Sequence, residues 1–145
     1  MLLLDTNVLL DAHRSDSPHH ESVRPWLVDA LEGAETVGLS DVVRLGFVRI
    51  STHPRVFYPP SSTAEAFDFL DALAGTPRVV SPRPGPGFDA LWREVAAGAD
   101  ASGSRMTDAW LATLARQHGA TLVTSDRGFA RYPGLRWVVP TPAPS

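Results

Sequence analysis

At 145 residues the chain is long enough for one domain with a sizeable hydrophobic core, and too short to divide comfortably into two. It contains no cysteine and its 13 basic residues are all arginine, which excludes disulfides, zinc–thiolate sites, thiol catalysis and every mechanism that needs a lysine. The formal net charge of -3 excludes a globally basic nucleic-acid binder, so any contact with RNA has to come from a local patch.

The first half of the chain predicts strands that alternate with helices. The unbroken apolar run 1–4 indicates a buried strand, and apolar residues then recur at helical spacing, as on one face of 18–31. The predicted elements are a strand at 1–4, helices at 8–13 and 18–31, a strand at 35–39 and a helix at 41–50. No segment has the length and composition of a signal peptide or a membrane span, so we expect a cytoplasmic protein with no membrane partner.

The second half continues this alternation. Ser62 or Thr63 can cap a helix that runs to Gly75, and Thr107 is expected to cap another that runs to Gly119. The remaining predicted elements are a strand at 78–80, a helix at 88–98, and strands at 120–124 and 136–139. This order favours a single α/β domain over 1–140, a three-layer α/β/α sandwich around a mainly parallel sheet, followed by a polar Pro-rich tail at 141–145.

Two aspartates, Asp5 and Asp126, each lie just past a predicted apolar strand. The carboxyl ends of parallel strands form the ligand crevice of an open sheet, so these two carboxylates are expected to converge. Asp108, in the first turn of a predicted helix, adds a third if that helix begins at the same edge. Each also has a plainer interpretation: Asp5 as a helix cap, Asp108 as an acid that complements the helix dipole, and Asp126 as a turn residue. Only their joint arrangement indicates a site.

Three clustered carboxylates repel one another, and a hard divalent cation removes that repulsion. Mg²⁺ or Mn²⁺ prefers oxygen ligands, keeps several waters and commonly bridges carboxylates to a phosphate. Such a site can activate a water molecule and stabilise the charge that develops on a phosphodiester. The acids therefore predict metal-assisted phosphodiester hydrolysis.

Motifs in both halves of the chain resemble one known family. The opening motif is LDTNVLL at 4–10, and the closing half contains TDAWLA at 107–112 and GATLVTSDRGF at 119–129. Together they are similar to the motifs of PIN-domain ribonucleases. LGFVRI at 45–50 and PRVF at 54–57 resemble one branch of that family, the VapC-type toxins of bacterial VapBC toxin–antitoxin pairs.

The resemblance implies a Mg²⁺-dependent endoribonuclease, the toxin of a type II pair, that cleaves transfer RNA or other structured RNA. It implies that Asp5, Asp108 and Asp126 are the catalytic, metal-binding residues. It also implies a VapB-type antitoxin as partner, in a hetero-oligomer or with the toxin as a homodimer. Such an antitoxin is expected to pack an apolar helix into a groove between the helices 18–31 and 41–50, and to reach a cationic side chain into the acids.

Seven residues are weaker candidates for a supporting role: Thr6, Asn7, Asp41, Arg105, Thr124, Ser125 and Arg127. The polar residues near the strand ends can hold the acids, bind metal-bound water or contact a phosphate, and the two arginines can meet RNA phosphates. Their plainer interpretations are turn formation, backbone satisfaction and, for the arginines, simple solvation.

One position departs from the family pattern. Many PIN domains carry a glutamate in the helix after the second strand, and the register from Ser40 puts Gly46 there. Asp41, the only acid in that helix, lies one and a half turns earlier and is more simply a helix-start acid. The site is therefore expected to bind one metal ion firmly and a second one weakly. The alternative function is a PIN-like module with weak or lost catalysis that binds RNA or antitoxin. A phosphoryl-transfer domain, such as a receiver or phosphatase, is disfavoured by the missing lysine and by Asn7.

Overall fold

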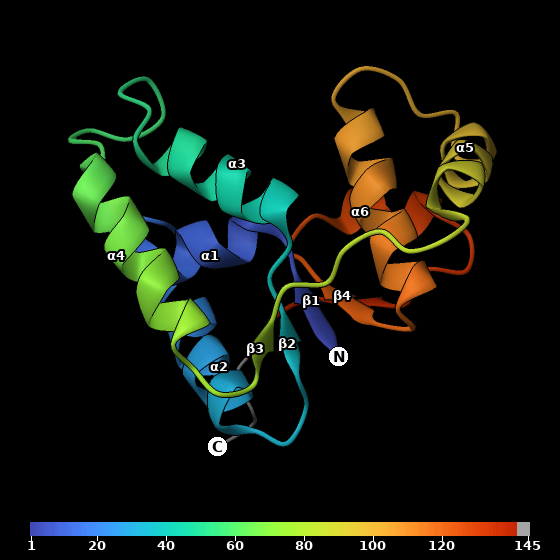
Figure 1. The fold of residues 1–145 in the computed structure, drawn as a ribbon. Coiled ribbons are helices and arrows are strands. Elements are labelled where there is room, and N and C mark those ends of the chain that lie inside the picture. Colours follow the sequence, from blue (N-terminus) through green and yellow to red (C-terminus); the bar gives the residue numbers. More distant parts are fainter. Residues whose placement is uncertain (142–145) are drawn as a thin grey trace.

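A five-stranded sheet lies at the centre of the structure, a computed structural model that describes residues 1–141 (Figure 1). The elements follow one another in the order β1 (Leu2–Leu4), α1 (Thr6–His13), α2 (His20–Glu32), β2 (Val37–Gly38), α3 (Asp41–Ser51), α4 (Thr63–Ala74), β3 (Val79–Val80), α5 (Phe88–Gly98), α6 (Arg105–Gln117), β4 (Thr121–Val123), the short 3₁₀ helix η1 (Arg127–Arg131) and β5 (Trp137–Val138). No helix within this part of the chain is both long and apolar enough to span a membrane.

The order of the strands determines where a ligand crevice can form. All strand pairs are parallel, and the order across the sheet is β3-β2-β1-β4-β5. The chain therefore builds outward from β1 in one direction and then, with β4 and β5, in the other. Parallel sheets with such a reversal open a crevice at the carboxyl ends of the two strands between which it occurs. Here these strands are β1 and β4.

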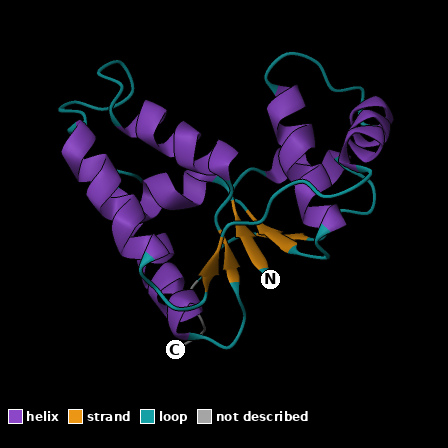
Figure 2. Ribbon diagram, in the orientation of Figure 1, coloured by secondary structure: helices purple, strands orange, loops and turns teal. Residues whose placement is uncertain are grey.

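Helices cover both faces of the sheet. Figures 1 and 2 show α1 to α4 on one side and α5 with α6 on the other, which makes three layers. The central strands are buried on both faces, with Leu3, Leu4, Leu122 and Val123 almost fully excluded from solvent. Strands buried on both sides read as continuous apolar runs, which is why short segments such as Leu2–Leu4 are recognisable in the sequence.

Most of the predicted architecture is confirmed. The three-layer α/β/α fold and the parallel sheet are present, and α5 has the bounds predicted for it. Ser62 caps α4 with a reciprocal capping box: its hydroxyl accepts from the backbone N–H of Glu65, and the Glu65 carboxylate accepts from the backbone N–H of Ser62. From residue 142 onward, the predicted tail lies outside the described residues.

Two expectations are wrong. Thr107 does not cap α6, because that helix begins at Arg105 and Thr107 already lies in its first turn. The predicted groove between α2 and α3 is not formed, because both helices pack against α1, which lies between them, while α3 packs on its other side against α4 (Figure 1). Of the apolar residues on α3 that prompted this groove, Val43 and Phe47 are fully buried in the core. Neither correction moves Asp108 from the first turn of α6.

Candidate active site at the carboxyl edge of the sheet

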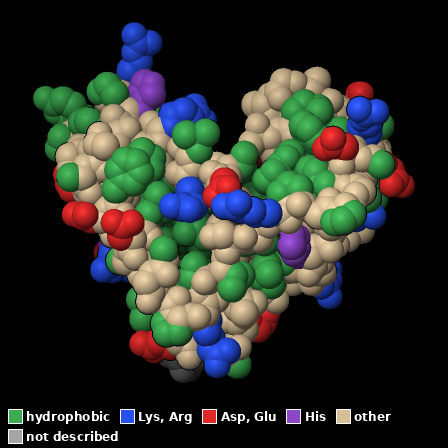
Figure 3. Space-filling view, viewed as in Figure 1, with side chains coloured by type: hydrophobic (Ala, Val, Ile, Leu, Met, Phe, Trp, Pro, Cys, Tyr) green, Lys and Arg blue, Asp and Glu red, His purple; other side chains and the backbone are tan. Residues whose placement is uncertain are grey.

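A pocket of about 480 Å³ opens at the carboxyl edge of the sheet, between α3 and α6. Figure 3 shows the molecule hollowed between two lobes, with hydrophobic side chains on the walls of the notch. The pocket is lined by Asp5, Thr6, Asn7, Leu10, Val42, Val43, Leu45, Gly46, Arg49, Ile50, Ser104, Thr107, Asp108, Leu111 and Asp126. The three acids that the sequence singles out therefore lie in one cavity, at the place where the strand order predicts a crevice.

Asp5 is fixed by donors on several sides. It directly follows β1 and caps α1, with its Oδ1 accepting from the backbone N–H of Thr6 at 2.7 Å. Its Oδ2 accepts from the Thr124 hydroxyl at 2.7 Å and from the Asn7 amide at 3.1 Å. The plainer interpretation of Asp5 as a helix cap is thus correct, and the capping geometry also turns the carboxylate into the pocket.

Asn7 and Thr124 tie the ends of the two central strands together. The Asn7 amide also donates to the Thr124 hydroxyl at 3.0 Å, and its Oδ1 accepts from the backbone N–H of Ser125 at 3.1 Å. The backbone N–H of Asp126 donates to the same Thr124 hydroxyl at 3.0 Å. A single buried hydroxyl therefore contacts the segments that carry Asp5 and Asp126, and sets the spacing of these two acids.

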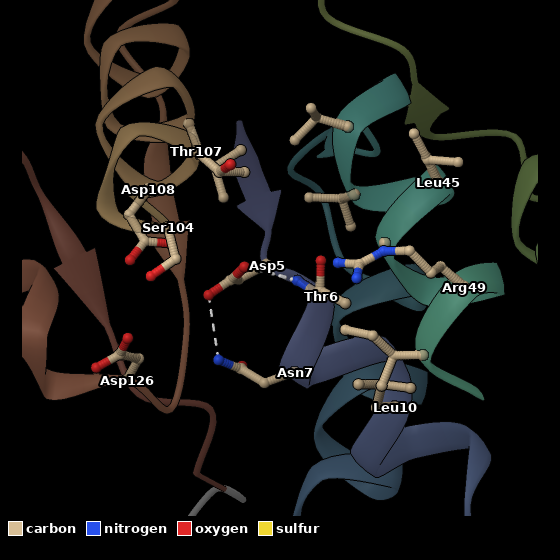
Figure 4. A pocket seen from close by; sticks show the side chains of 15 residues that line it. Asp5, Thr6, Asn7, Leu10, Leu45, Arg49, Ser104, Thr107, Asp108 and Asp126 are labelled. Atoms are coloured by element: carbon tan, nitrogen blue, oxygen red, sulfur yellow. Dashed lines mark hydrogen bonds between the residues drawn. The ribbon is translucent and has the colours of Figure 1, made fainter. Parts of the chain in front are cut away.

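Asp126 and Asp108 complete the acidic side of the pocket. Asp126 lies at the start of η1, where its carboxylate accepts from the backbone N–H of Gly128 at 2.8 Å. Asp108 comes from the first turn of α6. Figure 4 shows the carboxylates of Asp5, Asp108 and Asp126 around the same part of the cavity, each carried by a different segment.

The electrostatics of the acids reflect this convergence. The pKa of Asp108 rises from 3.8 to about 6, first because the side chain is desolvated and then because of the negative charges of Asp5 and Asp126. Arg131 and Arg105 oppose this rise. Burial also raises the pKa of Asp5, against the hydrogen bonds from Thr124, Thr6 and Asn7, and the charge of Asp126 adds to the rise. Charges that raise one another's pKa in this way favour a bound cation.

The donor set fits Mg²⁺ or Mn²⁺ in chemistry. Within residues 1–141, no group of three His, Cys, Asp or Glu side chains is arranged so that it could hold a metal ion by itself. Mg²⁺, however, is commonly bound through one or two carboxylates, while waters and substrate phosphate oxygens complete its shell. Asp5, Asp108 and Asp126 provide only hard oxygen ligands, and none of them forms an ion pair with a basic side chain in the described part of the chain.

Comparison with known proteins identifies the family. The model of the PIN domain matches residues 2–135. This chain belongs to the PIN-domain family. Ribonuclease VapC31 of Mycobacterium tuberculosis is 41% identical over 140 residues, which cover 97% of this chain and 99% of that protein, and Ribonuclease VapC25 of the same species is 39% identical over the same shares. The predicted resemblance to PIN domains and to their VapC-type branch is therefore confirmed.

Solved structures agree on the PIN fold. The crystal structure of VapBC2 from Rickettsia felis, bound to a DNA fragment from the VapBC2 promoter, matches this chain with a TM-score of 0.69. The match covers 95% of this chain and 97% of that one, at 18% sequence identity. At this identity the likeness supports the fold alone.

Gly46 and Asp41 lie in different places relative to the pocket. Gly46 lines the pocket, and a Cβ added there would lie 3.0 Å from Thr6 Oγ1, so α3 closely approaches the start of α1. Asp41 lies on the exposed surface at the start of α3, within 3.7 Å of Arg44 and 3.8 Å of Arg83. Asp41 is not among the residues that line the pocket, so it does not replace the glutamate that many PIN domains carry at the position of Gly46.

The other supporting candidates divide into two groups. Asn7, Thr124 and Ser125 belong to the hydrogen-bond network around Asp5, and Thr6 lines the pocket. Arg105 acts on Asp108 only through its charge, and its backbone carbonyl accepts from the Tyr132 hydroxyl at 3.1 Å. Arg127 is exposed on η1, and neither arginine lines the pocket.

Two polar residues of the pocket, Ser104 and Arg49, were not predicted from the sequence. Ser104 precedes α6 and Arg49 lies in the last turn of α3, yet both line the cavity. No acid or motif marks Ser104. For Arg49 the signal was its spacing of three residues from Gly46, which puts both on one face of the helix.

The raised pKa of Asp108 predicts a pH-dependent stability of the metal-free protein. The folded chain binds this proton more tightly than the unfolded chain, so the carboxyl destabilises the fold as pH rises from about 4 through 6. D108N removes this effect and is expected to raise the free energy of unfolding at pH 7.5 by about 1 kcal/mol, a value reduced for a half-exposed side chain. Urea unfolding in EDTA at pH 7.5 and at pH 4 tests this, since the gain should vanish at pH 4. A D108N protein less stable than wild type at pH 7.5 contradicts the assignment.

Proposed function

We propose that this PIN domain is a divalent-metal-dependent endoribonuclease that hydrolyses phosphodiester bonds in transfer RNA or other structured RNA. The observation that carries the proposal is the convergence of Asp5, Asp108 and Asp126 in one pocket at the carboxyl ends of β1 and β4. The relatives at 39–41% identity over nearly the full chain are named as ribonucleases, which supports RNA as the substrate class.

The residues that line the pocket and those buried beneath it have distinct tasks in this reaction. Asp5, Asp108 and Asp126 would hold Mg²⁺ or Mn²⁺, which when bound supplies an activated water and neutralises charge on the phosphodiester. Thr124 and Asn7 hold Asp5 in one rotamer through donors at 2.7 and 3.1 Å, so the carboxylate does not have to reorganise when substrate arrives. The rigid strand ends under the pocket keep the acids at fixed positions while RNA lies in the notch between α3 and α6.

We further propose that the protein is the cytoplasmic toxin of a type II pair, restrained by a VapB-type antitoxin in a hetero-oligomer. The relatives carry VapC names, and VapBC2 of Rickettsia felis was solved bound to promoter DNA. Large apolar side chains that this fold leaves exposed support an apolar partner: Leu45 on α3 is 68% exposed and Phe67 on α4 is 49% exposed. Leu45 lies on one of the two helices expected from sequence to bind the antitoxin, whereas Phe67 lies on a helix that was not expected to do so.

A binding module without useful catalysis is the second candidate, and Gly46 favours it. The pocket lacks an acid on the α3 wall, so the acidic groups face it from the β1, β4 and α6 side alone. In that case G46E is expected to increase cleavage, provided that Thr6 moves by a few tenths of an ångström to admit the new Cβ.

The test is cleavage of purified transfer RNA and of a structured RNA fragment by the purified protein. We expect cleavage with Mg²⁺ or Mn²⁺ and none in excess EDTA, because the pocket offers acids and no histidine for a metal-free mechanism. Restoring the metal after chelation should restore cleavage. Cleavage that continues undiminished in EDTA refutes the metal dependence. RNA binding without cleavage in any metal selects the binding module.

A further inference from the structure

Arg49 is the one basic side chain among the pocket-lining residues of the described chain, residues 1–141. It lies in the last turn of α3, so it belongs to the wall opposite Asp108 and Thr107 of α6. Figure 4 shows its side chain extending from α3 toward the side of the cavity where Thr6 and Asp5 lie. The pocket thus has carboxylates on one side and a single guanidinium on the other.

Two other arginines of the α1–α3 region, Arg14 and Arg44, already have partners. Arg14 donates to Asp16 and to the Pro59 carbonyl and lies over the Phe57 ring. Arg44, about one and a half turns before Arg49 but outside the pocket, is 3.7 Å from Asp41. Within residues 1–141, the guanidinium of Arg49 forms neither an ion pair nor a hydrogen bond; only the Arg49 backbone carbonyl accepts, from the Thr52 hydroxyl. An unpartnered guanidinium that lines a cavity keeps all its donors available for a ligand.

Gly46 explains why this guanidinium is available. Gly46 and Arg49 are three residues apart and therefore neighbours on one face of α3. A carboxylate at position 46 would be an i,i+3 partner for Arg49, and glycine offers none. The close approach of Gly46 to Thr6 also brings the next turn of α3, with Arg49, to the rim of the pocket.

An RNA backbone in this pocket would be stabilised by a positive charge on the α3 wall. An RNA phosphate that approaches Asp5, Asp108 and Asp126 meets like charges, which a metal at the acids offsets only on that side of the pocket. We propose that Arg49 binds a phosphate of the RNA backbone on the α3 wall, and so holds the strand with an adjacent phosphodiester at the acids. Guanidinium binds phosphate in a bidentate manner, which fixes the orientation of the strand as well as its position. This inference rests on the proposed ribonuclease function.

The test compares R49Q with R44Q, a matched control on the same helix whose partner Asp41 lies outside the pocket. RNA affinity is measured by fluorescence anisotropy with a labelled structured RNA and Mg²⁺, in a D126N background that prevents cleavage during the titration. R49Q is expected to raise Kd about tenfold, the loss of one charge-assisted contact, while R44Q leaves it within about twofold. R49Q should also reduce the slope of log Kobs against log salt by about 0.7 to 0.9, as expected for one lost phosphate contact. R49K should keep that slope and bind with intermediate affinity.

Steady-state cleavage by the otherwise wild-type protein provides a second readout. R49Q should raise KM more than it lowers kcat, because Arg49 binds the strand away from the reacting bond. If R49Q and R44Q have the same affinity, salt slope and KM in a protein that cleaves RNA, the role of Arg49 is overturned and the ribonuclease function stands. If the wild-type protein neither binds nor cleaves RNA, both fail.

Discussion

Replacing any one of Asp5, Asp108 and Asp126 by asparagine is expected to lower RNA cleavage roughly 10³-fold or more, with the fold retained. Asparagine keeps the size of the side chain and one oxygen, but it removes the negative charge that a divalent cation requires. The acids line one pocket and in the proposed mechanism act on one ion, so a second substitution is expected to add little to the first.

The control for these variants is D89N. Asp89 lies in the first turn of α5, as Asp108 does in α6, but it is exposed and outside the pocket. D89N should therefore cleave RNA within about twofold of the wild-type rate. Circular dichroism and urea unfolding establish that each variant is folded. A folded variant of any of the three acids that cleaves at the rate of D89N would remove that acid from the site.

Thr124 is expected to have the next largest effect, although it does not line the pocket. It is fully buried, and its hydroxyl donates to Asp5 Oδ2 while it accepts from Asn7 and from the backbone N–H of Asp126. T124V leaves the Asp126 backbone N–H without a partner and removes one hydrogen bond each from Asn7 and Asp5, so it is expected to lower the free energy of unfolding by about 2 to 3 kcal/mol. Because the same bonds set the position of Asp5 relative to Asp126, cleavage should fall about 10²-fold.

T124S separates the two effects of this hydroxyl. Serine keeps the hydrogen bonds and loses one methyl group, so cleavage should stay within about threefold of wild type while stability falls by about 1 kcal/mol. Urea unfolding and initial cleavage rates of both variants provide the measurement. Full cleavage activity in a folded T124V protein would show that the Thr124 hydroxyl does not position Asp5 for cleavage.

The strand-and-acid pattern of the sequence was enough to predict the fold and the acidic side of the pocket. Buried parallel strands leave apolar runs, and an aspartate directly after such a run lies at the carboxyl edge whatever the distance in sequence to the next one. Asp5 and Asp126, 121 residues apart, are brought together because Leu4 and Val123 are partners in adjacent strands. The plainer interpretations, Asp5 as a helix cap and Asp126 as a turn residue, are correct as well, since the same turns point both carboxylates into the crevice.

The opposite wall of the pocket could not be predicted in the same way. Which face of α3 meets the cavity depends on how that helix packs on α1 and α4, and exposed and buried apolar residues have the same appearance in a sequence. The prediction of a groove between α2 and α3 was wrong for this reason. Arg49 was missed because an arginine on a helix is usually solvated, and only its place in the pocket distinguishes it from Arg44. Thr107 was taken for a cap because threonine is a preferred N-cap residue, whereas α6 begins at Arg105 and Ser104 before it makes no side-chain cap hydrogen bond.

The central claim, a metal held by Asp5, Asp108 and Asp126, is tested most directly by the anomalous diffraction of Mn²⁺ in crystals of the wild-type protein. We expect a Mn²⁺ peak in the pocket, about 2.1 Å from carboxylate oxygens of one or two of these aspartates, with waters in the remaining positions. We also expect the peak to be absent from D5N crystals grown under the same conditions. A Mn²⁺ concentration that supports RNA cleavage but leaves the pocket empty, or fills only a site elsewhere on the protein, would contradict this claim.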